Sequence, residues 1–314
     1  MISARLCFSA ALALLCAAPS FARIEREVEK TFTVSPGGTL KVSTFGGNIS
    51  VEPGSGNQVV VKARQVFSKA DNEREADQIA EDLEMTIEQR GNDVTAQARY
   101  NKNRFGGFRW GSTPVNVSFT VVVPSRFNVD LDTSGGNIEV GDLEGEAKVQ
   151  TSGGNLRFGR FQGPVEGRTS GGNISIDEAR DRLKVSTSGG NIRVGRASGE
   201  VNLRNSGGAI RVDRVAGTLD ASTSGGSVQA NVEGPVKGDV TLSTSGGSVD
   251  LRVEPSAAFR LDASTSGGRV QAEGLTVQLE SGGAGRDRLV GAVNGGGPTV
   301  RLRSSGGNIN VKPL

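Results

Sequence analysis

One glycine-rich loop gathers the aromatic and arginine side chains best suited to contact a ligand. The run 104–111 contains the only tryptophan of the chain, and its candidate contacts are Phe105, Phe108, Arg109 and Trp110. Aromatic rings stack on sugars or insert at a membrane surface, and arginine binds carboxylate and phosphate groups. We therefore name these four residues as candidate ligand contacts. The alternative is that they pack on their own domain.

A second candidate is a pair of arginines at equivalent positions of neighbouring sequence repeats. Arg193 and Arg211 end an outward column that also holds Glu139, Arg157 and Ser175, so no acid separates the two arginines in that column. Two adjacent guanidinium groups favour an anion, such as a phosphate or carboxylate of an envelope polymer. The alternative is an ordinary solvated face.

The composition removes most catalytic and metal chemistry. The chain has no histidine, which is the commonest general base and a usual zinc ligand. Its two cysteines, Cys7 and Cys16, lie in an N-terminal segment that we expect to be removed, so the mature chain forms no disulfide. We predict no catalytic residue, no cofactor and no metal site. The near balance of 36 basic and 34 acidic residues gives no reason to expect a nucleic acid partner.

The first 22 residues are typical of a secretory signal peptide. Arg5 precedes an apolar run from Leu6 to Ala18, and Ser20-Phe21-Ala22 fits a cleavage site. The run is too short to span a bilayer, and no later stretch reaches a transmembrane length. We predict that the chain is exported, cleaved near Ala22 and soluble in the periplasm or outside the cell.

A glycine-rich repeat organises the rest of the chain. The motif Ser-Gly-Gly-x-apolar-x-apolar recurs first every 18 and then every 21 residues, and its first glycines are Gly135, Gly153, Gly171, Gly189, Gly207, Gly225, Gly246 and Gly267. Apolar and polar residues alternate within each unit, which is typical of a strand with one buried face. Each unit has two strands and two corners and thus forms one turn of a coil. One coil buries too little to fold alone, so the coils must stack.

The aligned repeats predict which residues form the core and the corners. The first columns of the two strands are Ile138, Leu156, Ile174, Ile192, Ile210 and Val228, and Ala147, Val165, Leu183, Val201 and Leu219. Threonines before the corner and asparagines after it should form hydrogen-bonded ladders along the rod. The corner glycines indicate either a positive φ or a close approach of two backbones.

Residues 23–130 are organised differently, and we predict that they form an N-terminal capping region. Strand-like runs occupy 39–44, 59–66 and 115–123. A helix should begin near Asp71, with Ser68 or Asp71 as its N-cap. This region would cover the open edge and the apolar end of the first coil.

The last repeat, at residues 305–311, ends three residues before Leu314. We therefore expect the final strand to lie at a barely covered edge of the solenoid. Such an edge can pair with a second copy, so end-to-end self-association is a further prediction.

The repeats resemble the bacterial exported putative-adhesin domains, a family of unknown function. The resemblance covers about residues 38–314 and is carried by Gly46-Gly47-Asn48-Ile49, Val121-Val122-Val123-Pro124 and Thr133-Ser134-Gly135-Gly136-Asn137-Ile138. Together with the repeats, it predicts an all-β, single-chain and right-handed β-solenoid of about ten coils, which fills residues 131–314. The resemblance brings no catalytic residue.

Two functions are consistent with these features. We predict a noncatalytic, adhesin-like or envelope scaffold protein that binds envelope polysaccharide or another envelope protein through its faces or loops. The alternative is a carbohydrate-active β-helix enzyme, a lyase or hydrolase, which needs two carboxylates across a groove. The outward column Lys148, Glu166, Lys184, Asn202 and Asp220 alternates in charge instead, which suits pairing between strands.

Overall fold

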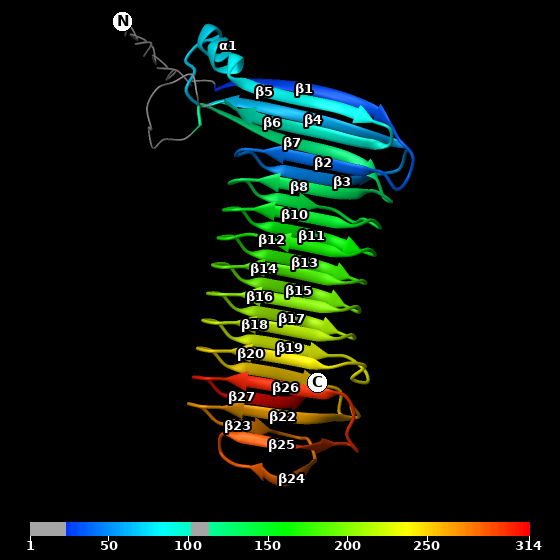
Figure 1. Ribbon diagram of the computed structural model, residues 1–314, viewed down its shortest axis with the longest axis vertical. Helices are drawn as coiled ribbons and strands as arrows, with labels where there is room; N and C mark the ends of the chain where they lie inside the picture. The colour runs from blue at the N-terminus through cyan, green and yellow to red at the C-terminus, as the bar shows by residue number, and fades with distance from the viewer. Residues whose placement is uncertain (1–22, 102–112) are drawn as a thin grey trace, which may run out of the picture.

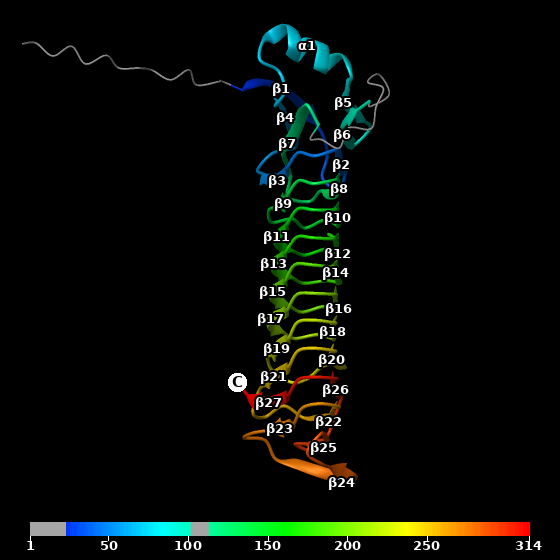
Figure 2. The same ribbon diagram turned by 90° about the vertical axis from the view of Figure 1, so that its left-hand side faces the viewer.

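The computed structural model describes residues 23–101 and 113–314, which form a long rod built from two sheets that face each other (Figures 1 and 2). The predicted signal peptide and the 104–111 loop lie outside these residues. Two strands per repeat, joined by corners, build successive coils, so the predicted β-solenoid is confirmed. No helix in the described part of the chain is long and apolar enough to cross a membrane.

The first sheet, sheet A, contains 13 strands within the described ranges. In spatial order they are β1 (Ile24–Thr33), β4 (Gln58–Phe67), β7 (Val115–Pro124), β3 (Ile49–Gly54), β9 (Ile138–Val140), β11 (Leu156–Phe161), β13 (Ile174–Ala179), β15 (Ile192–Ala197), β17 (Ile210–Val215), β19 (Val228–Val232), β21 (Val249–Val253), β27 (Ile309–Pro313) and β23 (Val270–Ala272).

The second sheet, sheet B, contains 14 strands of the described chain. In spatial order they are β24 (Val277–Ala284), β25 (Arg288–Val293), β22 (Phe259–Thr265), β26 (Thr299–Ser304), β20 (Val240–Thr244), β18 (Leu219–Thr223), β16 (Val201–Asn205), β14 (Leu183–Thr187), β12 (Val165–Arg168), β10 (Ala147–Thr151), β8 (Asn128–Thr133), β2 (Thr39–Thr44), β6 (Asp93–Tyr100) and β5 (Leu83–Arg90).

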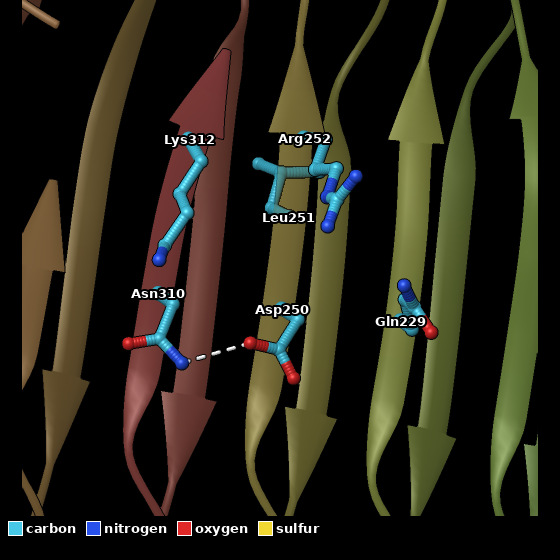
Figure 3. Close-up of a pocket in the computed structure, with 6 residues that line it drawn as sticks. All are labelled: Gln229, Asp250, Leu251, Arg252, Asn310 and Lys312. Atoms are coloured by element: carbon cyan, nitrogen blue, oxygen red, sulfur yellow. Dashed lines mark hydrogen bonds between the residues drawn. The ribbon is translucent and has the colours of Figure 1, made fainter. Parts of the chain in front are cut away.

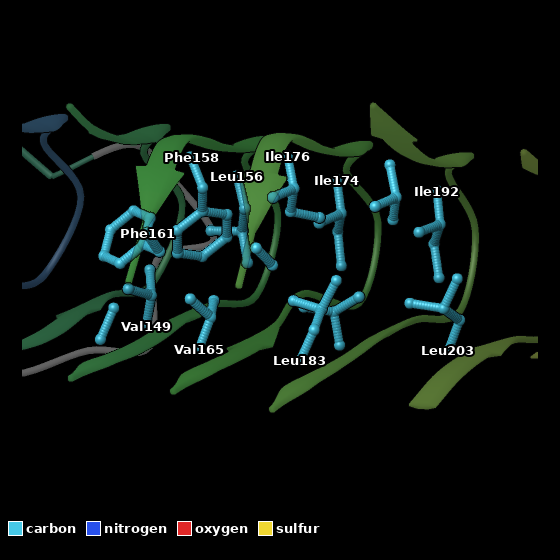
Figure 4. Packing of buried hydrophobic residues seen from close by; sticks show 14 of the residues in the cluster. Val149, Leu156, Phe158, Phe161, Val165, Ile174, Ile176, Leu183, Ile192 and Leu203 are labelled. Atoms are coloured by element: carbon cyan, nitrogen blue, oxygen red, sulfur yellow. The ribbon is translucent and has the colours of Figure 1, made fainter. Parts of the chain in front are cut away.

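The core fills the space between the two sheets, as the aligned repeats predicted (Figure 4). Leu156 pairs with Ile174 and Ile174 with Ile192 in parallel register, while Ala147 pairs with Val165 in the other sheet. All five side chains are at most 1% exposed. Because strand side chains alternate between faces, the same register that stacks these residues inward places their neighbours in columns on the outer surface.

Buried threonines satisfy the corner carbonyls, and the predicted threonine ladder is confirmed. The Thr169 hydroxyl donates to the carbonyl oxygen of Gly154 at 2.8 Å and accepts from the backbone N–H of Gly172 at 3.3 Å. The donated bond recurs at Thr133, Thr151, Thr187, Thr223, Thr244 and Thr265. Each hydroxyl therefore bonds to the corner of the neighbouring coil, and those of Thr151, Thr169 and Thr244 also accept from the corner of their own coil.

Asparagines form a second ladder on the other side of the corner. The Asn137 side-chain oxygen accepts from the backbone N–H of Asn155, and Asn155 does the same for Asn173, both at 2.8 Å. The ladder continues through Asn191, which accepts from the N–H of Ala209. Alanine cannot pass the bond on, so this run of the ladder ends there.

The corner glycines are required by a close approach of backbones. A Cβ atom on Gly172 would lie 1.9 Å from the carbonyl oxygen of Gly154, a backbone atom that cannot move aside. Gly154, Gly190, Gly208 and Gly226 meet the preceding corner in the same way. None of these glycines has a positive φ. Of the two reasons that the sequence left open, close approach is therefore the correct one.

The C-terminal coil is inserted into the rod rather than added at its end. β26 lies between β20 and β22, and β27 lies between β21 and β23 (Figure 1). Val300, Leu302, Ile309 and Val311 are completely buried. The prediction that the final strand forms a barely covered edge is therefore wrong. The edge strands at this end are β23 and β24.

The N-terminal part caps the opposite end. β1, β4 and β7 extend sheet A in antiparallel pairs, the hairpin of β5 and β6 extends sheet B, and helix α1 (Glu73–Glu81) lies above them (Figure 2). The predicted N-cap is wrong by one to four residues: Asn72 caps the helix by accepting from the N–H of Glu75 at 3.0 Å. Arg26 joins the helix to β1 through Glu73 and Asp77.

The two glycines of one corner should respond differently to a methyl group. We expect Gly172→Ala to lower the free energy of unfolding by about 3 kcal/mol, because the corners must separate to admit the Cβ. Gly171→Ala is the matched control, since its Cβ would lie 3.6 Å from the nearest atom, and its effect should stay within about 0.5 kcal/mol. Urea unfolding measures both. Equal effects would contradict the close-approach explanation.

The threonine ladder gives a second stability prediction. Thr169→Val keeps the shape of the side chain but leaves the Gly154 carbonyl and the Gly172 N–H without their bonds, so unfolding should become about 1 to 3 kcal/mol easier. Ser170→Ala, at the exposed neighbouring position, is the control and should change little. Chemical denaturation of the two variants checks this, and a neutral Thr169→Val would refute the role of the ladder.

Candidate binding surface

The outer face of sheet A carries two columns of polar side chains that run along the rod. The first column is Glu139, Arg157, Ser175, Arg193, Arg211, Gln229, Asp250 and Asn310. The second column is Arg160, Glu178, Arg196 and Arg214, and after a β-bulge between β17 and β19 it resumes as Asn231, Arg252 and Lys312. Parallel strands in register bring these residues together from separate repeats.

Arg193 and Arg211 are adjacent, as predicted, but one carboxylate binds both of them. Asp213 accepts from Nη2 of Arg193 at 2.9 Å and from Nε of Arg211 at 2.7 Å. Asp213 lies outside their column, at the position where Gly195 stands in the previous coil, so the column alone did not show the pairing. The two arginines and Asp213 form a cluster with one net positive charge, which we call the arginine clamp.

Asp213 is held in its charged form by this clamp. Burial would raise the pKa of its carboxyl group, but the hydrogen bonds from Arg211 and Arg193 outweigh burial and hold the pKa below its ordinary value. A lowered pKa means that the folded state prefers the carboxylate. The clamp therefore contributes to stability above the ordinary pKa of aspartate, and this contribution is lost as the pH falls through the lowered value.

The lower part of the second column is rich in cations that the sequence analysis did not single out. Arg214 pairs with Glu233 at 3.2 Å, and Lys312 pairs with Glu273 at 2.9 Å. Arg196 and Arg252 are exposed and form no ion pair within the described residues. Column alignment could have found Arg196 and Arg214. It could not find Lys312 beside Arg252, because that neighbour comes from the inserted C-terminal coil.

A shallow hollow of about 280 Å³ lies between the two columns on β19, β21 and β27 (Figure 3). Gln229, Asp250 and Asn310 line it from the first column, and Arg252 and Lys312 from the second. The Asn310 amide donates to Asp250 at 2.8 Å. The hollow thus offers amide and carboxylate groups on one side and two cations on the other.

The outer face of sheet B differs in its charge pattern. Lys148, Glu166, Lys184, Asn202 and Asp220 stand in register, so this predicted column is confirmed. Its lysines and acids alternate, and side-chain pairs such as Arg168 with Glu166 and Arg204 with Asp220 compensate the charges locally. On sheet B of the described chain no two cations stand directly opposite each other, whereas on sheet A they do, as at Arg196 and Arg214.

The remaining candidates do not form a site in the described residues. Phe105, Phe108, Arg109 and Trp110 lie outside the described part of the chain, and their role as ligand contacts stays a prediction. Within the described ranges, no group of three or more aspartate, glutamate, cysteine or histidine side chains is placed to hold a metal ion.

Residues 29–312 match the family described as Toastrack DUF4097. The chain belongs to this family. The stacked coils and the two long sheets are thus those of a Toastrack protein. A comparison with curated proteins returned no match.

Several solved structures are similar to this Toastrack protein. A putative adhesin from Bacteroides fragilis is 13% identical, with a TM-score of 0.39, over 92% of this chain and 97% of that one. A putative adhesin from Parabacteroides merdae is 13% identical, with a TM-score of 0.45, over 92% and 96%. A putative cell adhesion protein from Clostridium sporogenes is 12% identical, with a TM-score of 0.22, over 92% and 100%.

Removal of the central carboxylate should expose the contribution of the clamp. We expect Asp213→Asn to lower the free energy of unfolding at pH 7 by about 1 kcal/mol, because the bound pair is partly exposed to solvent. Urea unfolding at several pH values should show that the difference from the wild type shrinks below about pH 4, as the wild-type carboxyl group becomes protonated.

Asp177→Asn is the matched control for this variant. Asp177 occupies the same column position in β13, but no arginine pairs with it among the described residues. Its substitution should have a smaller effect at pH 7. If both variants behaved alike, the clamp would contribute no specific stability.

Proposed function

We propose that this Toastrack protein is an exported, noncatalytic binding protein of the cell envelope, adhesin-like or scaffold-like, whose binding surface is the outer face of sheet A. One observation carries the proposal: polar columns in register run along this face, with a step of about 4.8 Å between strands. A surface that repeats along one direction suits a ligand that also repeats along its length.

The physical advantage of such a face is multivalency. Each contact of an exposed side chain with a solvated ligand contributes little, but successive contacts to one extended ligand add because the later ones are intramolecular. The hollow on β19, β21 and β27 is shallow, so it is suited to an extended polymer rather than to an enclosed small molecule. Export is supported by the predicted signal peptide of residues 1–22.

The face is also rigid, which reduces the entropy lost on binding. The inward neighbours of its columns, such as Val194 and Val212, are fully buried, and each strand is hydrogen-bonded on both sides. Side chains anchored on such strands hold their spacing when a ligand arrives. The proposal therefore rests on a preformed surface and requires no folding upon binding.

A binding screen of the chain from residue 23 to 314 tests this proposal. The probes are cell-wall sacculi, soluble envelope polysaccharide and anionic lipid vesicles, and the soluble fraction is also assayed for released sugars. We expect saturable binding to sacculi or polysaccharide without release of reducing ends or unsaturated sugars. Cleavage would instead favour the carbohydrate-active enzyme, and no binding to any of the three probes would reject the proposal.

A blocking variant assigns the binding to one face. Gln229→Trp places a large ring at the hollow of sheet A, whereas Thr241→Trp places the same ring on the outer face of sheet B as the control. We expect the first variant to weaken binding by about tenfold, or about 1.4 kcal/mol, and the second to leave it unchanged. Equal effects of the two variants would show that the ligand does not bind specifically to the outer face of sheet A.

A further inference from the structure

The lower part of the second column of sheet A, which we call the cation column, consists of Arg196, Arg214, Asn231, Arg252 and Lys312. This column costs stability unless something outside the chain compensates it. Like charges directly opposite each other on adjacent strands are destabilising. Arg196 stands directly opposite Arg214, and Arg252 stands opposite Lys312. On its other side Arg196 faces Glu178, but that carboxylate pairs with Arg180 at 3.0 Å. Acids at the corners compensate Arg214 and Lys312, but Arg196 and Arg252 have no ion-pair partner among the described residues.

Elsewhere in the rod, opposed side chains in a column avoid this repulsion. The cation column is therefore an exception that needs an explanation. In the upper part of the same column, Arg160 stands opposite Glu178, and on sheet B, Lys148 stands opposite Glu166. Arg193 and Arg211 are opposite each other too, but Asp213 lies between their guanidinium groups. The two pairs of opposed cations are therefore a local departure from the pattern of the rod. One pair lies on β15 and β17 and the other on β21 and β27, and Asn231 of β19 stands between them.

The hollow beside this column shows which anion fits. Its other wall presents the amides of Gln229 and Asn310 and the carboxylate of Asp250, all of which can hydrogen-bond hydroxyl groups (Figure 3). The cations of Arg252 and Lys312 stand across the hollow and can bind carboxylates. A ligand that carries hydroxyl and carboxylate groups on the same unit, repeated along a chain, uses both walls.

From this arrangement we infer that the face from β15 to β27 binds a linear acidic polysaccharide that runs along the rod axis. Its carboxylates pair with Arg196 and Arg252, the two cations without an ion-pair partner in the described residues, and its hydroxyl groups bond to the first column. The length covered is about 19 Å, which is four strand steps of about 4.8 Å. This inference rests on the proposed function and specifies its ligand.

Other polyanions fit the face less well. Single-stranded nucleic acid needs aromatic side chains on which bases stack, and the outward residues of β15 to β27 include none. A flat anionic bilayer would press the carboxylate of Asp250 against its own negative charge, and among the described residues the large apolar side chain exposed near this face is Leu314 alone, beyond the end of β27. The acidic polysaccharide avoids both problems.

Paired variants test the inference with polygalacturonate, a linear polymer of uronic acid, as the probe. The double variant Arg196→Gln/Arg252→Gln removes the two unpartnered cations of sheet A. The control Lys148→Gln/Lys184→Gln removes two exposed lysines from the outer face of sheet B, so the net charge changes equally. We expect the first variant to bind about tenfold more weakly than wild type and the control within about twofold of it.

Two further measurements separate charge from fold. Arg196→Lys/Arg252→Lys should retain most of the binding, because it keeps both charges, and methyl-esterified polygalacturonate should bind weakly to every variant. Without ligand, Arg196→Gln/Arg252→Gln should melt at a temperature at least as high as wild type, since repulsion along the column is relieved. A lower melting temperature would overturn the argument that the cation column costs stability.

The outcomes distinguish this inference from the broader proposal. If wild type binds sacculi but the sheet A and sheet B variants are indistinguishable, the acidic polysaccharide site is wrong and the binding function stands. Equal binding of the esterified polymer, or tighter binding of single-stranded DNA than of polygalacturonate, also overturns the inference. If wild type binds no envelope material of any kind, the proposed function fails and the inference fails with it.

Discussion

The fold depends on the contact between the backbones of successive Gly-Gly corners. The carbonyl oxygen of Gly154 occupies the space that a side chain on Gly172 would need, and the same contact recurs from coil to coil. Because the corners touch without intervening side chains, they fix the step between coils. The threonine and asparagine ladders then join each corner to the next, and the buried columns between the sheets follow the same step.

This repetition explains what could be predicted from the sequence. A residue such as Ile174 has the same neighbours as its equivalents one repeat away, so alignment of the repeats predicts its burial and its register. The same regularity hides exceptions. The C-terminal coil has an ordinary repeat sequence. Its local sequence pattern does not show that the coil is inserted between two earlier coils, or which two these are. The pairing of Lys312 with Arg252 therefore could not be predicted from the repeats. For the same reason the prediction of an exposed final strand was wrong.

The ion pairs of the candidate surface depend on how far each side chain reaches, and alignment of the repeats into columns does not give this information. Asp213 reaches both Arg193 and Arg211 because it stands two residues along its strand from Arg211, and bonds of this kind depend on side-chain reach rather than on column position. In a regular solenoid, packing between the sheets restricts the inward residues to apolar types. The outward residues are not restricted in this way, so their charge can change from coil to coil. The opposed cations Arg196 and Arg214, and Arg252 and Lys312, are an example of that freedom.

The inserted coil also affects the order in which the rod can be assembled. The chain is synthesised from its N-terminus, and most coils can dock on the preceding one as soon as they emerge. β22 and β23 cannot dock directly on β20 and β21 in this way, because the place between them belongs to residues 299–313. The lower end must therefore wait for the last residues of the chain, so a truncated chain cannot complete this end of the rod.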